Sequence, residues 1–169
     1  MFGGERHRGG ASSPISSSPG DRDKDKGGMK GERWRVSILT GLKTASRAAK
    51  DSSITGVPEV AMLVETLVTL MADNHGNTAV FDTNRRLCSN VVDVLRIVER
   101  LSEESATETD RETGRSLVEG VQEELDSVIS IIEAFKGKTK LKRFWTASWY
   151  RKRVEEAEAS VRSMLEYLN

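Results

Sequence analysis

From Trp34 to the end of the chain, apolar residues recur every three or four positions, and this period requires a helical fold. The pattern is clearest over about 78–103, where a seven-residue spacing persists for three heptads. The apolar seam of this segment consists of Val80, Asn84, Leu87, Val91, Val94, Val98 and Leu101. A period sustained over this length outweighs the weak helix propensity of β-branched residues, so the seam predicts an α-helix.

Four further segments have the same period, and we predict helices at about 34–51, 58–72, 114–136 and 140–168. Gly56 and Pro58 separate the first two, because glycine ends helices and proline suits the first turn of the next one. Short connectors make successive helices antiparallel neighbours. The chain is therefore predicted to be all-α, an up-and-down antiparallel bundle of four or five helices over residues 34–169.

Residues 1–33 lack the apolar side chains that such a bundle needs. Gly, Ser, Pro and mixed charges dominate, and only Phe2, Ile15 and Met29 are candidates for burial. Ordering this segment would cost roughly 1–2 kcal/mol per residue, which so little apolar surface does not offset. We predict a disordered N-terminal tail.

The residue types that carry catalysis or hold cofactors form no recognisable motif in this chain. A Gly-rich phosphate loop, an HExxH pair and a Glu-x-x-His pair are all missing. A single cysteine, Cys88, rules out a disulfide within the chain, and its place on an apolar stripe predicts a small buried side chain. His7 and His75 lie too far apart to suggest a zinc site. The acidic pairs at 103–104 and 123–124 are typical of solvated helix surfaces. We expect no catalytic residue, metal or cofactor, and therefore no enzyme.

The longest apolar stretch, about 57–72, is too short to span a bilayer and is interrupted by Glu59 and Glu65. No charged-then-apolar signal segment opens the chain. We expect a cytoplasmic protein, with peripheral contact to the inner membrane surface as an alternative.

The charges of the chain are unevenly distributed, although 26 Lys+Arg balance 26 Asp+Glu. Residues 136–153, which we call the basic-aromatic segment, contain eight basic residues, no acid and two of the three tryptophans. Its candidate binding residues are Lys136, Lys138, Lys140, Lys142, Arg143, Trp145, Trp149, Arg151, Lys152 and Arg153. Acidic residues dominate the remainder of residues 34–169, so the zero net charge conceals a dipolar molecule.

Three interpretations of the basic-aromatic segment compete. In the first, Phe144, Trp145 and Tyr150 pack into the end of the bundle and the cations face its acidic helices. In the second, the cations bind an anionic membrane at about 1 kcal/mol each, with tryptophan and tyrosine at the headgroups. The third, stacking and phosphate contacts with single-stranded nucleic acid, is disfavoured because the molecule is not basic as a whole and has no known binding motif. The first two are compatible with each other.

Two stretches add a resemblance to a known superfamily. The first is LKTASRAAKDSSITGVPEVAMLVETLVTLM at 42–71, where a helix turns through a Gly-Val-Pro corner into an apolar helix. The second is LDSVISIIEAFKGKTKLKRFWTASWYRKRVEEAEASVRSMLEYLN at 125–169, where a Lys-rich hinge separates two helices. With the long seam between them, they resemble the helical-bundle superfamily shared by the Cbl adaptor N-terminal domain and the N-terminal domain of mixed-lineage-kinase-like cell-death executioners, in its fungal-type forms.

The resemblance implies a four-helix signalling bundle that mediates protein contacts. In the cell-death branch it also implies self-association and engagement of anionic membranes through basic surface residues. We accordingly expect protein partners, with a second copy of the chain and an anionic membrane as candidates, and neither nucleic acid nor a small-molecule substrate. The alternative is a purely structural or regulatory bundle that binds one partner helix, a remnant of a larger multidomain protein.

Overall fold

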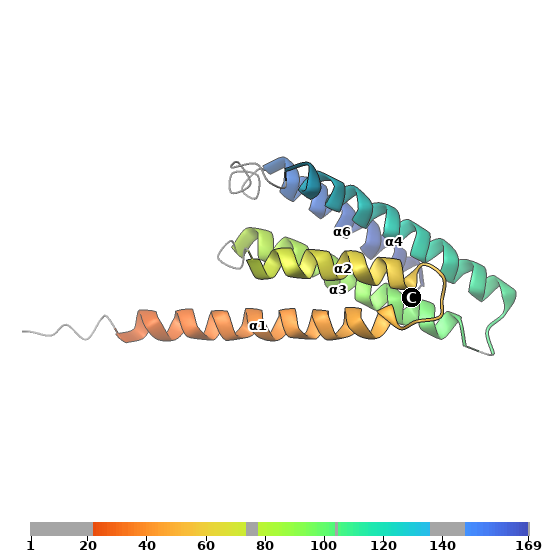
Figure 1. Ribbon diagram of the computed structural model, residues 1–169, viewed down its shortest axis with the longest axis horizontal. Coiled ribbons are helices and arrows are strands. Elements are labelled where there is room, and N and C mark those ends of the chain that lie inside the picture. The colour runs from red at the N-terminus through yellow and green to blue at the C-terminus, as the bar shows by residue number, and fades with distance from the viewer. Residues whose placement is uncertain (1–21, 74–77, 104, 136–147, 169) are drawn as a thin grey trace, which may run out of the picture. The chain divides into compact units, whose positions relative to one another are not determined.

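The computed structural model describes residues 22–73, 78–103, 105–135 and 148–168, whose regular elements are all helices, with no strand among them (Figure 1). The helices are α1 (Arg22–Lys50), α2 (Val57–Asp73), α3 (Thr78–Leu101), α4 (Glu108–Phe135) and α6 (Ser148–Leu168). The chain divides into an N-terminal unit, Met1–Arg33, and a larger unit, Trp34–Asn169. The predicted all-α class is confirmed.

Helices α2, α3, α4 and α6 form an up-and-down bundle in which each helix runs opposite to the one before it (Figure 1). α3 and α4 each pack against the other three members of this bundle. Their central position explains why the seam of α3 is so apolar: Leu87, Val91, Val94 and Val98 are fully buried. None of the described helices is long and apolar enough to cross a membrane.

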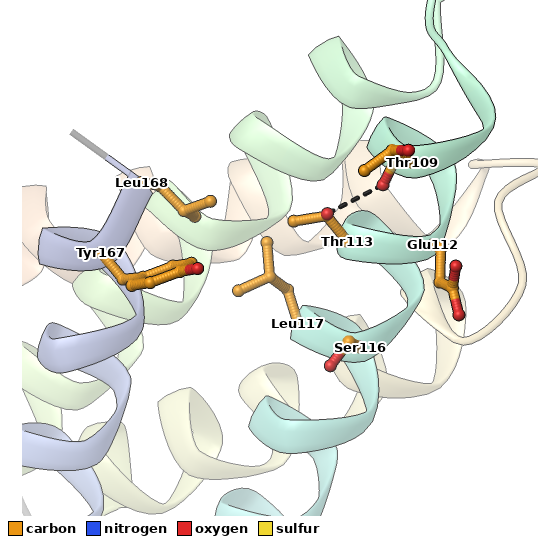
Figure 2. Close-up of a pocket in the computed structure, with 7 residues that line it drawn as sticks. All are labelled: Thr109, Glu112, Thr113, Ser116, Leu117, Tyr167 and Leu168. Atoms are coloured by element: carbon orange, nitrogen blue, oxygen red, sulfur yellow. Dashed lines mark hydrogen bonds between the residues drawn. The ribbon is translucent and has the colours of Figure 1, made fainter.

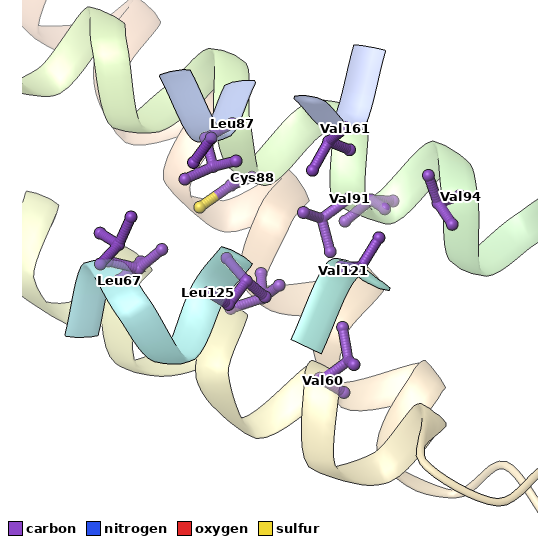
Figure 3. Packing of buried hydrophobic residues seen from close by; sticks show 14 of the residues in the cluster. Val60, Leu67, Leu87, Cys88, Val91, Val94, Val121, Leu125 and Val161 are labelled. Atoms are coloured by element: carbon purple, nitrogen blue, oxygen red, sulfur yellow. The ribbon is translucent and has the colours of Figure 1, made fainter. Parts of the chain in front are cut away.

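The core of the bundle is built mainly from valine and leucine (Figure 3). Val60 and Leu67 of α2, Val121 and Leu125 of α4, and Val161 of α6 are each at most 1% exposed. Burying one such side chain stabilises the fold by about 1.5–3 kcal/mol. The helical period predicted most of this core, but it did not identify Phe81 of α3, which is fully buried.

The first helix begins at Arg22, twelve residues before the predicted start at residue 34. Extending a helix from a packed segment adds one hydrogen bond per residue and needs no new nucleus, so polar residues can join it. Residues 31–33 are exposed, in agreement with the prediction that this stretch contributes nothing to the core. The rest of the predicted tail, residues 1–21, lies outside the described residues.

The fourth helix also begins earlier than predicted, at Glu108 rather than residue 114. The cause is a capping box formed by Thr107 and Asp110. The backbone N–H of Thr107 donates to Asp110 Oδ2 (2.8 Å), and the backbone N–H of Asp110 donates to Thr107 Oγ1 (3.2 Å). The hydroxyl of Thr107 also donates to Asp110 Oδ2 (2.6 Å), and these bonds lower the pKa of Asp110.

The turn from α1 to α2 depends on Gly56, as the sequence indicated. Gly56 has a φ of 87°, in the left-handed region that favours glycine. A Cβ atom at this position would lie 2.6 Å from Val118 Cγ1 of α4, so there is no space for a side chain. α2 then begins at Val57, with Pro58 in its first turn. Of the last predicted helix, 140–168, residues 140–147 lie outside the described residues, and α6 begins at Ser148.

Candidate functional site

The basic-aromatic segment is described only from Ser148 onward, in the first turns of α6. Six of its candidate residues therefore lie outside the described residues. They are Lys136, Lys138, Lys140, Lys142, Arg143 and Trp145. The other four, Trp149, Arg151, Lys152 and Arg153, are placed by the structure.

One side of this described part packs into the bundle. Tyr150 is 1% exposed, and its hydroxyl donates to Asn84 Oδ1 of α3 (3.1 Å). Burial raises the pKa of Tyr150, because the charged phenolate would lose its hydration. Arg153 donates from Nη2 to Glu124 Oε2 (2.8 Å) and from Nε to Ser127 Oγ (3.0 Å), both on α4. These contacts fit the interpretation in which an aromatic residue anchors the segment and a cation faces an acidic helix.

The other side of the same turns faces outward. Trp149 is 46% exposed, and Arg151 and Lys152 are exposed beside it. Arg151 Nε lies 3.7 Å from Glu155 Oε1, and Lys152 Nζ lies 3.9 Å from Glu156 Oε1, one turn further along α6. Such exposed pairs contribute less than about 1 kcal/mol each, so they leave these cations accessible to a stronger anionic partner.

A second cationic surface, which the sequence analysis did not single out, lies on α1. From Trp34 to Lys50 this helix carries four cations and no acid: Arg35, Lys43, Arg47 and Lys50. Its apolar face points to the bundle, where Leu42 and Ala49 are buried and Ile38 is partly buried. The sequence feature that could have identified this surface is the absence of acidic residues from 34 to 50. The sequence analysis passed over it because residues 136–153 have twice as many cations.

Aromatic and cationic side chains join the start of this stretch to α3. Trp34 contacts Phe81 with the ring centroids 6.2 Å apart. Arg35 lies 5.4 Å above the Phe81 ring and donates to Thr78 Oγ1 (2.6 Å). The guanidinium of Arg85 lies 5.6 Å from the centre of the Trp34 ring. Cation–π contacts are worth about 0.5–1 kcal/mol at exposed sites and more when they are desolvated, so these contacts help to hold the start of this stretch on α3.

A groove of about 290 Å³ lies between α1 and α3. Its lining combines apolar residues with charged ones: Ile38, Gly41, Leu42, Ala45, Arg85, Ser89, Val92, Asp93 and Arg96. Nη1 of Arg96 is engaged with Asp93 Oδ1 at 3.1 Å. Nε of Arg85 is buried and has no hydrogen-bond partner among the described residues. The groove therefore offers apolar contact beside charged side chains.

The outward face of α1, which we call the basic face, consists of Val36, Thr40, Lys43 and Arg47. These four residues are exposed and follow one another at four- and three-residue steps, so they share one side of the helix. Lys50, on the edge of this face, forms an ion pair with Glu65 of α2. The hydrogen bond from Lys50 lowers the pKa of Glu65, and the charges of Lys43 and Arg47 act in the same direction. Within the part of the chain that the structure describes, Lys43 and Arg47 have no ion pair of their own.

The outward face of α4 has the opposite sign. Glu119, Glu123, Asp126 and Glu133 are exposed at steps of four, three and seven residues, and we call them the acidic face. No ion pair to any of the four is present among the described residues. Like charges four residues apart on a helix destabilise it by about 0.2–0.5 kcal/mol per pair, so the acidic face costs the isolated chain some stability.

A shallow pocket of about 380 Å³ lies between the start of α4 and the end of α6 (Figure 2). Its lining consists of Thr109, Glu112, Thr113, Ser116, Leu117, Tyr167 and Leu168. In Figure 2 the side chain of Leu117 projects into the space toward Leu168 and Tyr167. The Thr113 hydroxyl donates to the backbone oxygen of Thr109 (2.8 Å) and is therefore not available to a ligand, so the pocket offers mainly apolar contact.

Buried polar residues at the interface of α3 and α6 have structural partners. Glu158, 7% exposed, accepts a hydrogen bond from Asn90 Nδ2 (2.9 Å) and is paired with Arg162 one turn later. Cys88 is fully buried, as predicted, and burial raises its pKa to about 12. Among the described residues no cluster of His, Cys, Asp or Glu could hold a metal ion.

Comparisons of this chain with models of protein families, with curated proteins and with solved structures find no match.

Proposed function

We propose that this chain is a non-enzymatic helical-bundle module for signalling, which acts through contact with other proteins and through self-association. The separation of charge over its exposed faces carries the proposal. α1 presents Lys43 and Arg47 to solvent, whereas α4 presents Glu119 and Glu123. Exposed charges that are not paired within the molecule attract complementary surfaces, speed their encounter and select against partners of like charge.

Among the described residues, the groups with shifted pKa values are compatible with a binding role. Each shift has a structural cause in the packing: burial for Cys88 and Tyr150, a helix cap for Asp110, and ion pairs for Glu65 and Arg162. Ion-pair and capping networks shift pKa values without taking part in chemistry.

The type of signalling in the proposal comes from the resemblance to the Cbl and mixed-lineage-kinase-like superfamily. The bundle of α2, α3, α4 and α6 has the architecture that this resemblance implies. We therefore place the module in cytoplasmic cell-death or innate-immunity signalling.

Self-association and partner binding can be tested directly. Sedimentation velocity over a wide concentration range should show a shift from monomer to larger species, and an affinity pull-down should retain specific proteins. A chain that stays monomeric at all concentrations and retains no protein would contradict the proposal.

Contact with an anionic membrane is a second candidate function, favoured by the exposed Trp149 beside Arg151 and Lys152 on α6. Tryptophan and cations together are typical of surfaces that lie at lipid headgroups. Co-sedimentation with neutral and phosphatidylserine-containing liposomes, at low and high salt, tests it. We expect salt-sensitive binding to the anionic liposomes only, and loss of binding when Lys138, Lys140, Lys142 and Arg143 are changed to Glu.

The matched control for this experiment changes four other exposed cations to Glu, Arg86 and Arg100 of α3 with Arg111 and Arg115 of α4, and so makes the same change in net charge. If this control loses as much binding as the variant of the basic-aromatic segment, binding follows net charge and the segment is not the docking site.

A regulatory bundle that binds one partner helix is the alternative, and the groove between α1 and α3 favours it. Ile38, Leu42, Ala45 and Val92 supply apolar contacts there, in a form suited to a helix. Substituting Ala45 with Glu should then abolish retention of the partner in a pull-down and leave self-association unchanged.

A further inference from the structure

We infer that the basic face of α1 docks on the acidic face of α4 in a second copy of this chain. The inference rests on the proposed function, because it assigns surfaces to the proposed self-association. Each face is exposed in the single chain, so neither is covered by the other within one molecule.

The two faces match in charge and in spacing. Lys43 and Arg47 are four residues apart on α1, and Glu119 and Glu123 are four residues apart on α4. Residues at this spacing lie about 5–6 Å apart on the same side of a helix, so two cations of one copy can meet two carboxylates of another at the same time. Asp126 lies on the next turn of the acidic face and extends it.

The basic face also has an apolar contact to offer. Val36 is 58% exposed and lies seven residues before Lys43, on the same side of α1. It supplies apolar surface that is removed from water on docking. The ionic contacts would fix orientation and the apolar contacts would add affinity.

The charge of the whole molecule favours a second copy over an unrelated acidic partner. The chain has 26 basic and 26 acidic residues, so two copies do not repel each other at long range. The carboxylates of the acidic face repel one another in the isolated chain, and docking of Lys43 and Arg47 relieves this repulsion. One contact therefore satisfies the charges of both faces that form no ion pair among the described residues.

The geometry predicts a heterologous contact, because the two surfaces that meet are different. Each copy keeps a free basic face and a free acidic face after one contact has formed. Assembly then continues by addition of further copies unless the rotation between them closes a ring.

The test compares three charge variants of the full chain by sedimentation velocity. Lys43→Glu with Arg47→Glu reverses the basic face, Glu119→Lys with Glu123→Lys reverses the acidic face, and the third variant combines all four changes. We expect each double variant to weaken self-association about tenfold or more, since attraction becomes repulsion at two positions. We expect the fourfold variant to recover it, because its faces are again complementary.

Mixing the two double variants provides a second form of rescue. The reversed α1 of one then matches the reversed α4 of the other, so the mixture should associate although neither variant does so alone. Rescue of either kind cannot arise from misfolding. Arg86→Glu with Arg100→Glu is the matched control, with the same change in net charge, and it should associate like the wild type.

High salt should weaken the association of the wild type, because at about 0.1 M salt the screening length is already near 10 Å.

Three results would overturn the inference: self-association that the double variants leave unchanged, failure of both rescues, or a control that is as defective as the α1 variant. In each of these cases the wild type still associates, so the proposed function stands. A wild type that never associates overturns the inference together with the proposed self-association. Loss of liposome binding by the α1 variant with unchanged self-association would assign the basic face to a membrane and overturn the inference alone.

Discussion

The start of α6 and residues 34–50 of α1 are both cationic and both carry a tryptophan, but their cations differ in how many ion pairs they form. In α6, Arg153 reaches Glu124 of α4, and Arg151 and Lys152 have carboxylates four residues further along the same helix. In α1, Lys50 has Glu65, whereas Lys43 and Arg47 have no ion pair among the described residues.

This difference shows that the density of positive charge in a sequence is a poor guide to where charge is available. The last cations of the basic-aromatic segment are followed by acids at the spacing that pairs them on a helix. The α1 stretch has fewer cations but no acid of its own. The predictions below test whether α6 is the anchored region and α1 the accessible one, from the largest expected effect to the smallest.

The largest difference should appear between Tyr150→Ala and Trp34→Ala. Tyr150 is buried and bonded to Asn84, so its truncation leaves a cavity and should cost about 3–5 kcal/mol of unfolding free energy. Trp34 is 49% exposed, and its removal should cost about 1 kcal/mol. Urea unfolding followed by circular dichroism measures both. Equal costs would mean that α1 is as firmly integrated as α6.

Gly56→Ala tests the turn that attaches α1 to the bundle. The positive φ and the close approach of Val118 should together cost about 1–3 kcal/mol. Val118→Ala alone loses packing, but in the double variant it removes the clash. We therefore expect the two substitutions to be less destabilising together than the sum of their separate costs in urea unfolding. Strict additivity would contradict the contact.

The third comparison is within α6, between Arg153→Ala and Lys152→Ala. Arg153 is half-buried and holds Glu124 and Ser127, so its loss should cost about 1–2 kcal/mol. Lys152 forms only an exposed pair within its own helix, and its loss should cost less than about 0.5 kcal/mol. If Lys152→Ala were the more damaging change, the division of α6 into an inward and an outward side would be wrong.

The smallest effect concerns the ion pair of Lys50 with Glu65, and it depends on pH. The pKa of Glu65 in the folded chain lies below its ordinary value of 4.5, so the pair stabilises the fold fully above that pH. This contribution is lost as the pH falls through the lowered pKa. Thermal unfolding should therefore show an advantage of the wild type over Glu65→Gln at neutral pH that shrinks below pH 4.5. An advantage that grows toward low pH would contradict the pairing.

The architecture was predictable because the helical period of the core leaves few alternatives. Leu87, Val91 and Val98 lie on the face of α3 that the sequence indicated, and Val154 and Val161 do so on α6. Helix starts were less predictable. The Thr107-x-x-Asp110 spacing of the capping box is readable in the sequence, but it lies in a polar stretch without the apolar period from which the start at residue 114 was predicted. The early start of α1 depends on propagation through polar residues.

The charged surfaces of α1, α4 and α6 could be predicted only in part, and the reason differs from that for the helix starts. Period and composition show which residues are charged, but ion pairs between helices depend on how the helices are placed in space. The pairing of Arg153 with Glu124 joins residues 29 positions apart, and that of Lys50 with Glu65 joins residues 15 apart. Because these contacts cannot be read from the sequence, the sequence analysis proposed residues 136–153 as the charged binding surface and did not propose α1.

The two polar contacts between α3 and α6 have a consequence for how the bundle is assembled. Valine and leucine faces pack almost equally well after a shift of one helical turn, so an apolar core alone sets the axial register of two helices loosely. Tyr150 meets Asn84, and two turns later Glu158 meets Asn90. A slip of one turn would leave buried polar atoms without partners at both points, at a cost of about 1–3 kcal/mol for each unsatisfied group. These two polar contacts therefore fix the axial register of α6 against α3, which the apolar contacts alone would leave open.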